Sequence, residues 1–183
     1  SVGVELFVLD DGWMPGRTND RAGLGDWRPD PSRFPRGLRP VADACHASGV
    51  LFGLWVEPEM VNPDSELYRS HPNWVLGDEG RPLSQMRRQL VLNMALDEVR
   101  DWCIAFLDRL LTDVQPDYLK WDMNRYVSER GGDRETPVRY MQNVYAVWAF
   151  LNEKHPRVLF ENCASGGGRA DFGMLPYADR MNR

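Results

Sequence analysis

The chain has 183 residues and an ordinary globular composition, with 43% hydrophobic and 27% charged residues. Its net charge of −5, without any block rich in lysine or arginine, argues against nucleic acid and anionic membranes as partners. The sequence has no run of about 18 apolar residues, so we expect no transmembrane helix.

Cysteine and histidine usage favours neither a disulfide framework nor a metal site. The 3 cysteines, Cys45, Cys103 and Cys163, are odd in number and form no CxxC pair. The 3 histidines are scattered, without the close spacing that a metal site needs. We therefore expect no metal, no cofactor and a reducing compartment. No signal peptide is visible, which also favours a cytoplasmic location.

The first half of the chain predicts two strands, each followed by a helix. Residues 4–9 form a buried strand that ends at an Asp-Asp-Gly-Trp run. A polar loop leads to a helix over 38–48, which Gly49 ends. The second strand covers 50–56. Residues 65–70 then begin a helix, with either Asp64 or Ser65 as the N-cap.

The second half repeats this pattern with longer helices. Residues 96–112 are amphipathic, because apolar residues recur there at helical spacing. Pro116 breaks this helix before a third strand over 118–122. Another long helix covers 138–154, and a fourth strand covers 158–162. Strands that alternate with helices predict βαβ units and a parallel sheet.

Every predicted strand ends in reactive side chains: Asp10 and Asp11, Glu57 and Glu59, Asp122, and Glu161 and Cys163. In a (β/α)₈ barrel the active site lies at the carboxyl ends of the strands. This layout favours a barrel over a doubly wound sheet, and no GxGxxG run follows any strand. A closed barrel needs eight units and about 250 residues. We therefore expect residues 1–183 to be a partial (β/α)₈ catalytic domain with about four βα units, cut from a longer protein.

Lys120 and Asp122 form the best-defined candidate site. On a strand, their side chains point to the same side. A lysine ammonium close to a carboxylate lowers the pKa of that carboxylate. An ionised carboxylate is what a glycosidase needs as its nucleophile. The structural alternative is a plain ion pair at a strand end.

Other strand ends offer groups that suit a sugar, each with a structural alternative. Asp10 and Asp11 can accept hydrogen bonds from hydroxyls, or form a turn around Gly12. Trp55 can contact a sugar ring or fill the core. Arg87 can reach sugar hydroxyls or pair with a surface acid.

The Cys-Ala-Ser-Gly-Gly-Gly run at residues 163–168 ends the fourth strand. Its glycines let a ligand approach the backbone closely, or they form a flexible connection. A thiol nucleophile at Cys163 lacks an evident histidine partner.

These segments resemble glycoside hydrolase family 36, the α-galactosidase family. The matching segments are FVLDDGW at 7–13, GDW at 25–27, FGLWVEPEMV at 52–61, HPNW at 71–74, LKWDMNR at 119–125 and ENCASGGGR at 161–169. Together they extend over nearly the whole chain, and those around Trp55 and Asp122 are long and specific.

The resemblance implies a (β/α)₈ catalytic domain that is usually flanked by two β domains, which we expect to lie outside this chain. It implies hydrolysis of terminal α-galactosyl residues from oligosaccharides of the raffinose and melibiose type. The reaction retains the anomeric configuration and uses no metal. Family members often assemble into oligomers, commonly tetramers, so we expect the full-length protein to be a homo-oligomer.

The family motifs also imply roles for particular residues. The nucleophile is the aspartate of the Lys-Trp-Asp motif, which is Asp122 here. Asp10, Asp11 and Lys120 would hold sugar hydroxyls, and Trp55 would form a wall of the pocket. The substrate-binding residues that the resemblance implies are Asp10, Asp11, Trp55, Arg87, Lys120, Asn124, Cys163, Ser165 and Gly166.

The chain departs from the family pattern at two places. The acid/base of the family is an aspartate in a Ser-Asp motif shortly after the Gly-Met-Leu segment, which is residues 173–175 here. We expect it beyond Arg183, since Asp179 does not match the motif. Asn93 stands where the family usually has an aspartate, and we expect only a local structural effect there.

Three other interpretations stay open. A galactosyltransferase of the same fold, similar to raffinose synthase, would keep Asp122 but pass galactose to an acceptor sugar. An α-N-acetylgalactosaminidase would need room for an acetamido group near Cys163 and Ser165. A catalytically incomplete, non-enzymatic barrel fragment would expose sheet edges and apolar helix faces.

Overall fold

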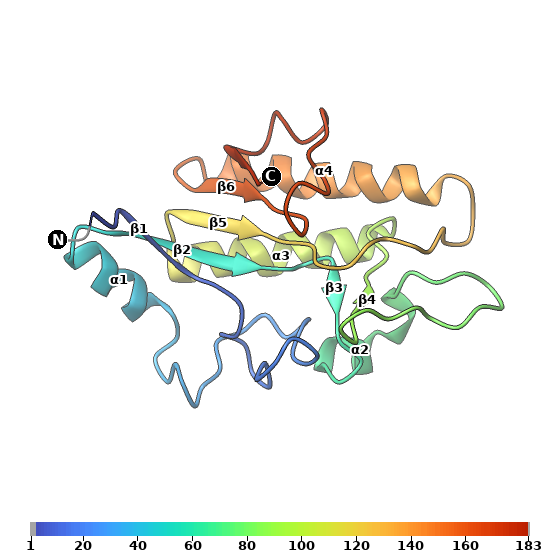
Figure 1. Cartoon of the computed structure of the whole chain (residues 1–183), viewed down its shortest axis with the longest axis horizontal. Helices are drawn as coiled ribbons and strands as arrows, with labels where there is room; N and C mark the ends of the chain where they lie inside the picture. The colour runs from blue at the N-terminus through green and yellow to red at the C-terminus, as the bar shows by residue number, and fades with distance from the viewer. Residues whose placement is uncertain (1–2, 183) are drawn as a thin grey trace.

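The computed structural model describes residues 3–182 and shows a parallel sheet with long helices beside it (Figure 1). The four expected strands all form: β1 (Leu6–Leu9), β2 (Leu51–Val56), β5 (Tyr118–Trp121) and β6 (Leu159–Asn162). They are neighbours in this order and all run parallel, and a short fifth strand, β7 (Arg180–Met181), pairs with β6. The strands follow one another as in a barrel, which confirms the expected partial (β/α)₈ arrangement.

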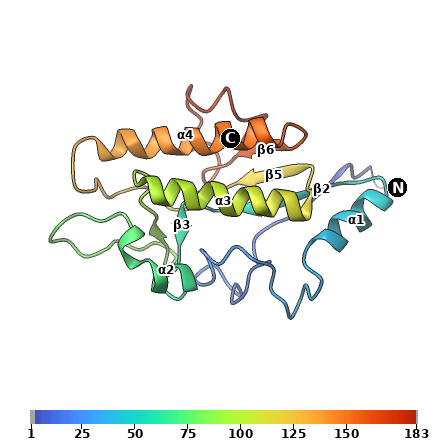
Figure 2. The same ribbon diagram turned by 180° about the vertical axis from the view of Figure 1, so that it is seen from behind.

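Three helices connect these strands: α1 (Arg39–Ala47), α3 (Asp97–Val114) and α4 (Thr136–Lys154). Seen from behind, all three lie in front of the strands (Figure 2). The apolar side of α3, which includes Val99, Cys103 and Leu107, is fully buried. Burial of this side holds α3 to the sheet and to α4, its neighbour in the fold.

The helix ends differ slightly from the predicted bounds for identifiable reasons. Helix α4 begins at Thr136 because Pro137 lies in its first turn, where the missing N–H is tolerated. Helix α3 extends to Val114 and ends where Gln115 takes a left-handed conformation. The N-cap of α2 (Glu66–Ser70) is Ser65, whose hydroxyl accepts a hydrogen bond from the Tyr68 N–H at 3.0 Å.

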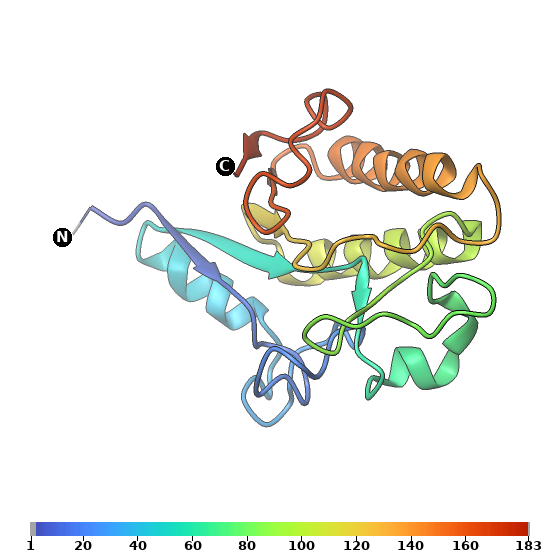
Figure 3. The ribbon, with the colours of Figure 1, turned by 45° about the vertical axis from the view of Figure 1, so that its right-hand side comes forward.

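Three very short elements have no counterpart in the prediction: β3 (Met60–Val61), the 3₁₀ helix η1 (Pro72–Trp74) and β4 (Leu90–Val91). Strand β3 turns steeply away from β2 and pairs antiparallel with β4 (Figure 3). Because β4 follows Gln89 directly, this pairing carries Gln89 back to the end of β2. Its Nε2 lies 3.3 Å from the Glu57 carboxylate.

Aromatic side chains join the sheet to its surroundings. The rings of Trp121 and Trp148 lie 5.1 Å apart and connect β5 to α4. The ring of Trp27, from the long loop after β1, stacks on Phe106 of α3 at 5.7 Å. Trp13 is buried and donates from Nε1 to the Trp55 carbonyl oxygen at 2.9 Å. Closely packed aromatic side chains therefore support the carboxyl ends of the strands.

The amino ends of two strands are fixed by a repeated contact. Asp117 precedes β5 and accepts a hydrogen bond from the Phe52 N–H at 2.8 Å. Asp179 precedes β7 and accepts one from the Phe160 N–H, also at 2.8 Å. Asp179 thus lies at the end of the sheet opposite Asp122. Among residues 3–182, no helix is long and apolar enough to cross a membrane.

Candidate active site

Asp122 follows β5 directly and is the centre of the candidate site. Its N–H donates to the Val56 carbonyl oxygen at 2.8 Å, which extends the β2–β5 pairing by one residue. Its Oδ2 accepts hydrogen bonds from Trp55 Nε1 at 3.0 Å and from Asn124 Nδ2 at 2.8 Å. Its Oδ1 accepts from the backbone N–H of Met123 at 2.8 Å and that of Ser165 at 3.4 Å. Donors from three parts of the chain thus converge on one carboxylate.

These donors keep Asp122 ionised. Burial by itself would raise the pKa of Asp122. Hydrogen bonds from the side chains of Trp55, Asn124 and Cys163 outweigh burial and hold this pKa below its ordinary value. Asp122 is therefore a carboxylate at neutral pH, which is the form that a nucleophile requires.

Lys120 has a different main partner from the one expected. Its Nζ donates to Asp10 Oδ2 at 2.9 Å, so the sequence-based pairing of Lys120 with Asp122 is corrected. Burial lowers the pKa of Lys120, but the contact with Asp10 and the nearby charge of Asp122 more than offset this and raise it. The ionised state of Asp122 rests mainly on its hydrogen bonds.

The turn after β6 closes over Asp122. Cys163 is buried, and its N–H donates to the Trp121 carbonyl oxygen at 2.9 Å. Ser165 takes a left-handed backbone with φ of 51°, which is unusual for a residue with a side chain. Gly166 has φ of 88° and accepts a hydrogen bond from the Ala164 N–H at 2.8 Å. This conformation places the Ser165 N–H next to the carboxylate.

Asp11 and Arg87, which the resemblance assigns to substrate, have protein partners. Both carboxylate oxygens of Asp11 accept hydrogen bonds from the guanidinium of Arg17, at 2.8 and 2.7 Å. Arg87 is exposed on the loop before β4, and its Nε lies 3.7 Å from Asp20. The structure thus brings Trp55, Asn124, Cys163 and Ser165 to Asp122, but places Asp11 and Arg87 in other ion pairs.

Glu57 is a neighbour of the nucleophile to which the sequence analysis gave no role. Its Oε1 accepts a hydrogen bond from the Asn124 N–H, and its Oε2 accepts one from Gln89 Nε2 at 3.3 Å. Burial raises the pKa of Glu57 to about 7. The negative charge of Asp122 also raises it, while the Asn124 hydrogen bonds oppose the shift. The position of Glu57 directly after a predicted strand could have indicated its place in the site. Gln89 lies in a loop, where no periodic pattern could have predicted its contact with Glu57.

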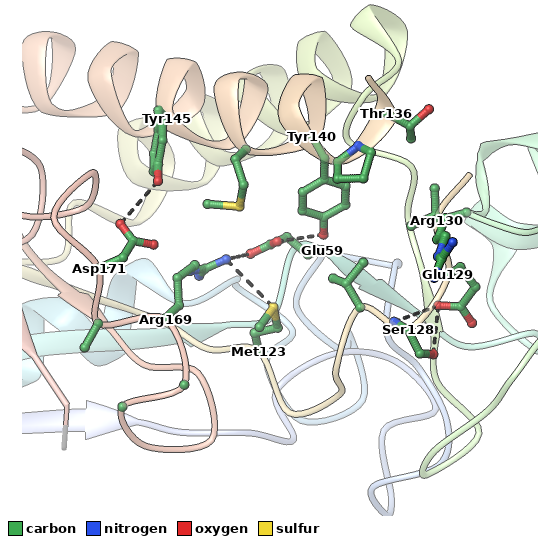
Figure 4. A pocket seen from close by; sticks show the side chains of 17 residues that line it. Glu59, Met123, Ser128, Glu129, Arg130, Thr136, Tyr140, Tyr145, Arg169 and Asp171 are labelled. Atoms are coloured by element: carbon green, nitrogen blue, oxygen red, sulfur yellow. Dashed lines mark hydrogen bonds and ion pairs between the residues drawn. The ribbon is translucent and has the colours of Figure 1, made fainter. Parts of the chain in front are cut away.

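Glu59 is the hub of a second buried network (Figure 4). It accepts hydrogen bonds from Trp121 Nε1 at 2.8 Å and from the Tyr140 hydroxyl at 2.7 Å, and it pairs with the Arg169 guanidinium. A cavity of about 580 Å³ lies against this network, between α4 and the segment that follows β6. Asp122 does not line this cavity, so the volume and the candidate nucleophile are separate features.

Comparison with known proteins gives one consistent result. The family model described as Melibiase matches residues 1–182. A probable α-galactosidase G of Aspergillus terreus is 48% identical over 187 residues, which cover 97% of this chain and 26% of that protein. An α-galactosidase of Escherichia coli is 44% identical over 182 residues, covering 99% of this chain and 26% of that protein.

The crystal structure of the family 36 α-galactosidase AgaA from Geobacillus stearothermophilus is also similar. It matches with a TM-score of 0.92 and 44% identity, covering 98% of this chain and 26% of that one. The chain therefore spans about a quarter of the length of these relatives. With the parallel sheet and the strand-end carboxylate, these matches show that the chain belongs to the melibiase family, glycoside hydrolase family 36, as a segment of its (β/α)₈ catalytic barrel.

Proposed function

We propose that the protein containing this chain is a retaining α-galactosidase in which Asp122 is the nucleophile. The observation that carries the proposal is the ionised Asp122 carboxylate at the carboxyl end of β5, held by several converging donors. Such a group suits attack on an anomeric carbon. The similar proteins named above are α-galactosidases, and variants of AgaA have been solved in complex with stachyose and with raffinose. We infer the same class of α-galactosyl oligosaccharide as the substrate.

In this mechanism Asp122 attacks the anomeric carbon of a terminal galactosyl residue. A bond forms between that carbon and a carboxylate oxygen while the glycosidic C–O bond breaks, and the acid/base protonates the leaving oxygen. Water then attacks the galactosyl ester, and the acid/base takes its proton, which restores Asp122 and releases galactose. The resemblance implies an aspartate outside residues 1–183 as the acid/base, and a retaining enzyme requires this group at about 5–5.5 Å from its nucleophile.

The neighbours of Asp122 orient this carboxylate and offer contacts to the sugar. The indole N–H of Trp55 and the amide of Asn124 orient the carboxylate for attack. The Lys120–Asp10 pair is partly exposed and offers both a donor and an acceptor to sugar hydroxyls. The resemblance also assigns Asp11 and Arg87 to substrate, and in this structure they pair with Arg17 and Asp20.

Hydrolysis of p-nitrophenyl α-galactoside by the full-length protein tests this proposal. We expect the parent to be active and Asp122→Asn to lose about 10⁴-fold or more in kcat, as nucleophile removal does in other covalent enzymes. Asp113→Asn removes an exposed carboxylate from α3 and serves as the matched control. An inactive parent, or an Asp122→Asn variant with the parental rate, would overturn the proposal. Turnover only with an added acceptor sugar would indicate a transferase.

A further inference from the structure

Glu57 is a buried carboxyl group that the mechanism above does not use. It follows β2 directly and its side chain is fully enclosed. A buried carboxyl group is unfavourable unless its surroundings compensate it, so its presence beside the nucleophile requires an explanation.

A short chain of contacts connects Glu57 to the nucleophile. Glu57 Oε1 accepts a hydrogen bond from the backbone N–H of Asn124. The side-chain Nδ2 of the same asparagine donates to Asp122 Oδ2 at 2.8 Å. Asn124 therefore links the two carboxyl groups, with its backbone on one and its side chain on the other. The contact between Glu57 and Asp122 thus passes through a single residue.

We propose that Glu57 is a positioning residue for Asp122: it fixes Asn124, whose amide orients the nucleophile, and its own charge tunes the reactivity of that nucleophile. This inference rests on the proposed α-galactosidase function and deepens it. Glu57 touches no reacting atom, because it acts only through Asn124 and through its electrostatic field.

The surroundings of Glu57 allow it to exist with or without a proton. Asp122 disfavours the ionised form, whereas Arg17 favours it. Gln89 Nε2 donates to the ionised form, and within residues 3–182 the other amide atom, Gln89 Oε1, is buried without a hydrogen-bond partner. If the amide of Gln89 turns over, this oxygen accepts from a protonated Glu57. The surroundings thus offer partners to both forms of Glu57, whose pKa burial raises to about 7.

The charge of Glu57 has a defined effect on the glycosylation step. Asp122 is negative before attack and neutral once it is an ester. An ionised Glu57 repels the free Asp122 carboxylate but not the ester, so its charge favours attack. It also stabilises positive charge that develops on the sugar ring in the transition state. We therefore expect the glycosylation rate to rise as Glu57 loses its proton.

The test compares the full-length parent with Glu57→Gln on 2,4-dinitrophenyl α-galactoside, measuring kcat/KM from pH 5 to 9. This leaving group departs without protonation, so the acid/base does not shape the profile of the glycosylation step. The parent should show a rise centred at about pH 7. Glu57→Gln should lack this rise and lose about 10- to 100-fold in kcat/KM, as misplaced reacting groups do. Asp179→Asn, which removes the charge of a carboxylate at the opposite end of the sheet, should keep the parental profile.

Each outcome has a separate meaning. Active parent and Glu57→Gln proteins with the same rate and the same pH profile would overturn the role of Glu57 and leave the α-galactosidase proposal intact. An inactive parent would overturn both. If Glu57→Gln fails to fold, Gln89→Met replaces it, since this change removes the donor to the ionised Glu57. The rise should then move to higher pH, and an unmoved rise would contradict the inference.

Discussion

At the scale of single residues, the state of Asp122 is decided by hydrogen bonds. The residue is 6% exposed, and burial alone would favour its protonated form. The donors from Trp55 and Asn124 reverse this preference. An exposed aspartate would be ionised without them, but its position would be less fixed.

Removal of one donor should therefore change the pH dependence of the full-length enzyme. Asn124→Ala deletes the amide that donates to Asp122 at 2.8 Å, so the pKa of Asp122 should rise. Because the ionised form is the active one, the acid limb of kcat/KM should move to higher pH. Asn152→Ala, which removes an amide that bonds to backbone carbonyls on and beyond α4, should leave this limb in place. An unchanged acid limb in Asn124→Ala would show that Asn124 does not set the ionisation of Asp122.

The role of a residue could be predicted only where the local backbone determines which residue it contacts. Asp122 and Asn124 lie two positions apart, so their contact follows from a short motif. The partner of Lys120 did not follow, because Asp10 is 110 positions away and reaches it across the sheet. The Asp11–Arg17 pair depends on the path of an irregular loop, which no periodic pattern describes.

At the scale of elements, the Glu59 network connects parts of the fold that are distant in sequence. Glu59 follows β2, Trp121 ends β5, Tyr140 lies on α4 and Arg169 follows β6. The guanidinium of Arg169 is buried and pairs with Glu59. Such a pair holds elements in register mainly because separation would leave a buried charge unpaired.

Loss of Glu59 should destabilise the catalytic domain strongly. We expect Glu59→Ala to lower its free energy of unfolding by about 3–5 kcal/mol, since Arg169 is then left buried without its counter-charge. Denaturant unfolding of the full-length protein measures this. Glu135→Ala is the control, because Glu135 is exposed and its ion pair with Arg139 lies at the surface, where such pairs contribute little. A loss at Glu59 no larger than that of the control would contradict a structural role for the network.

Element prediction succeeded where the signal was local. The long helices α3 and α4 carry many apolar residues at helical spacing, and their bounds were predicted to within two residues. The two-residue strands β3, β4 and β7 have no such signal, because their pairing partners are supplied by distant segments. The fifth parallel strand, β7, could therefore not be predicted from the sequence.

At the scale of the whole molecule, the sheet has two open edges. Within residues 3–182, β1 and β7 each pair with a single neighbour. Large apolar side chains on the strands, including Phe7 and Leu159, are nearly half exposed. Open strands beside exposed apolar groups favour association with other chains.

We expect residues 1–183 expressed alone to self-associate at micromolar concentration. Multi-angle light scattering should report a mass above that of one chain, and Phe7→Ser with Leu159→Ser should reduce it by removing exposed apolar surface. A single monodisperse monomer of the unmodified segment would contradict the view that its open edges require further strands.

The proposed mechanism requires Asp122 to form a covalent bond to the sugar. Incubation of the full-length protein with a 5-fluoro-α-galactosyl fluoride, which forms the glycosyl ester quickly and loses it slowly, tests this most directly. We expect peptide mapping by mass spectrometry to find the fluorogalactosyl group on Asp122. A label on Glu57 or another carboxylate, or hydrolysis of the parent substrate without any trapped ester, would contradict the role of Asp122 as the nucleophile.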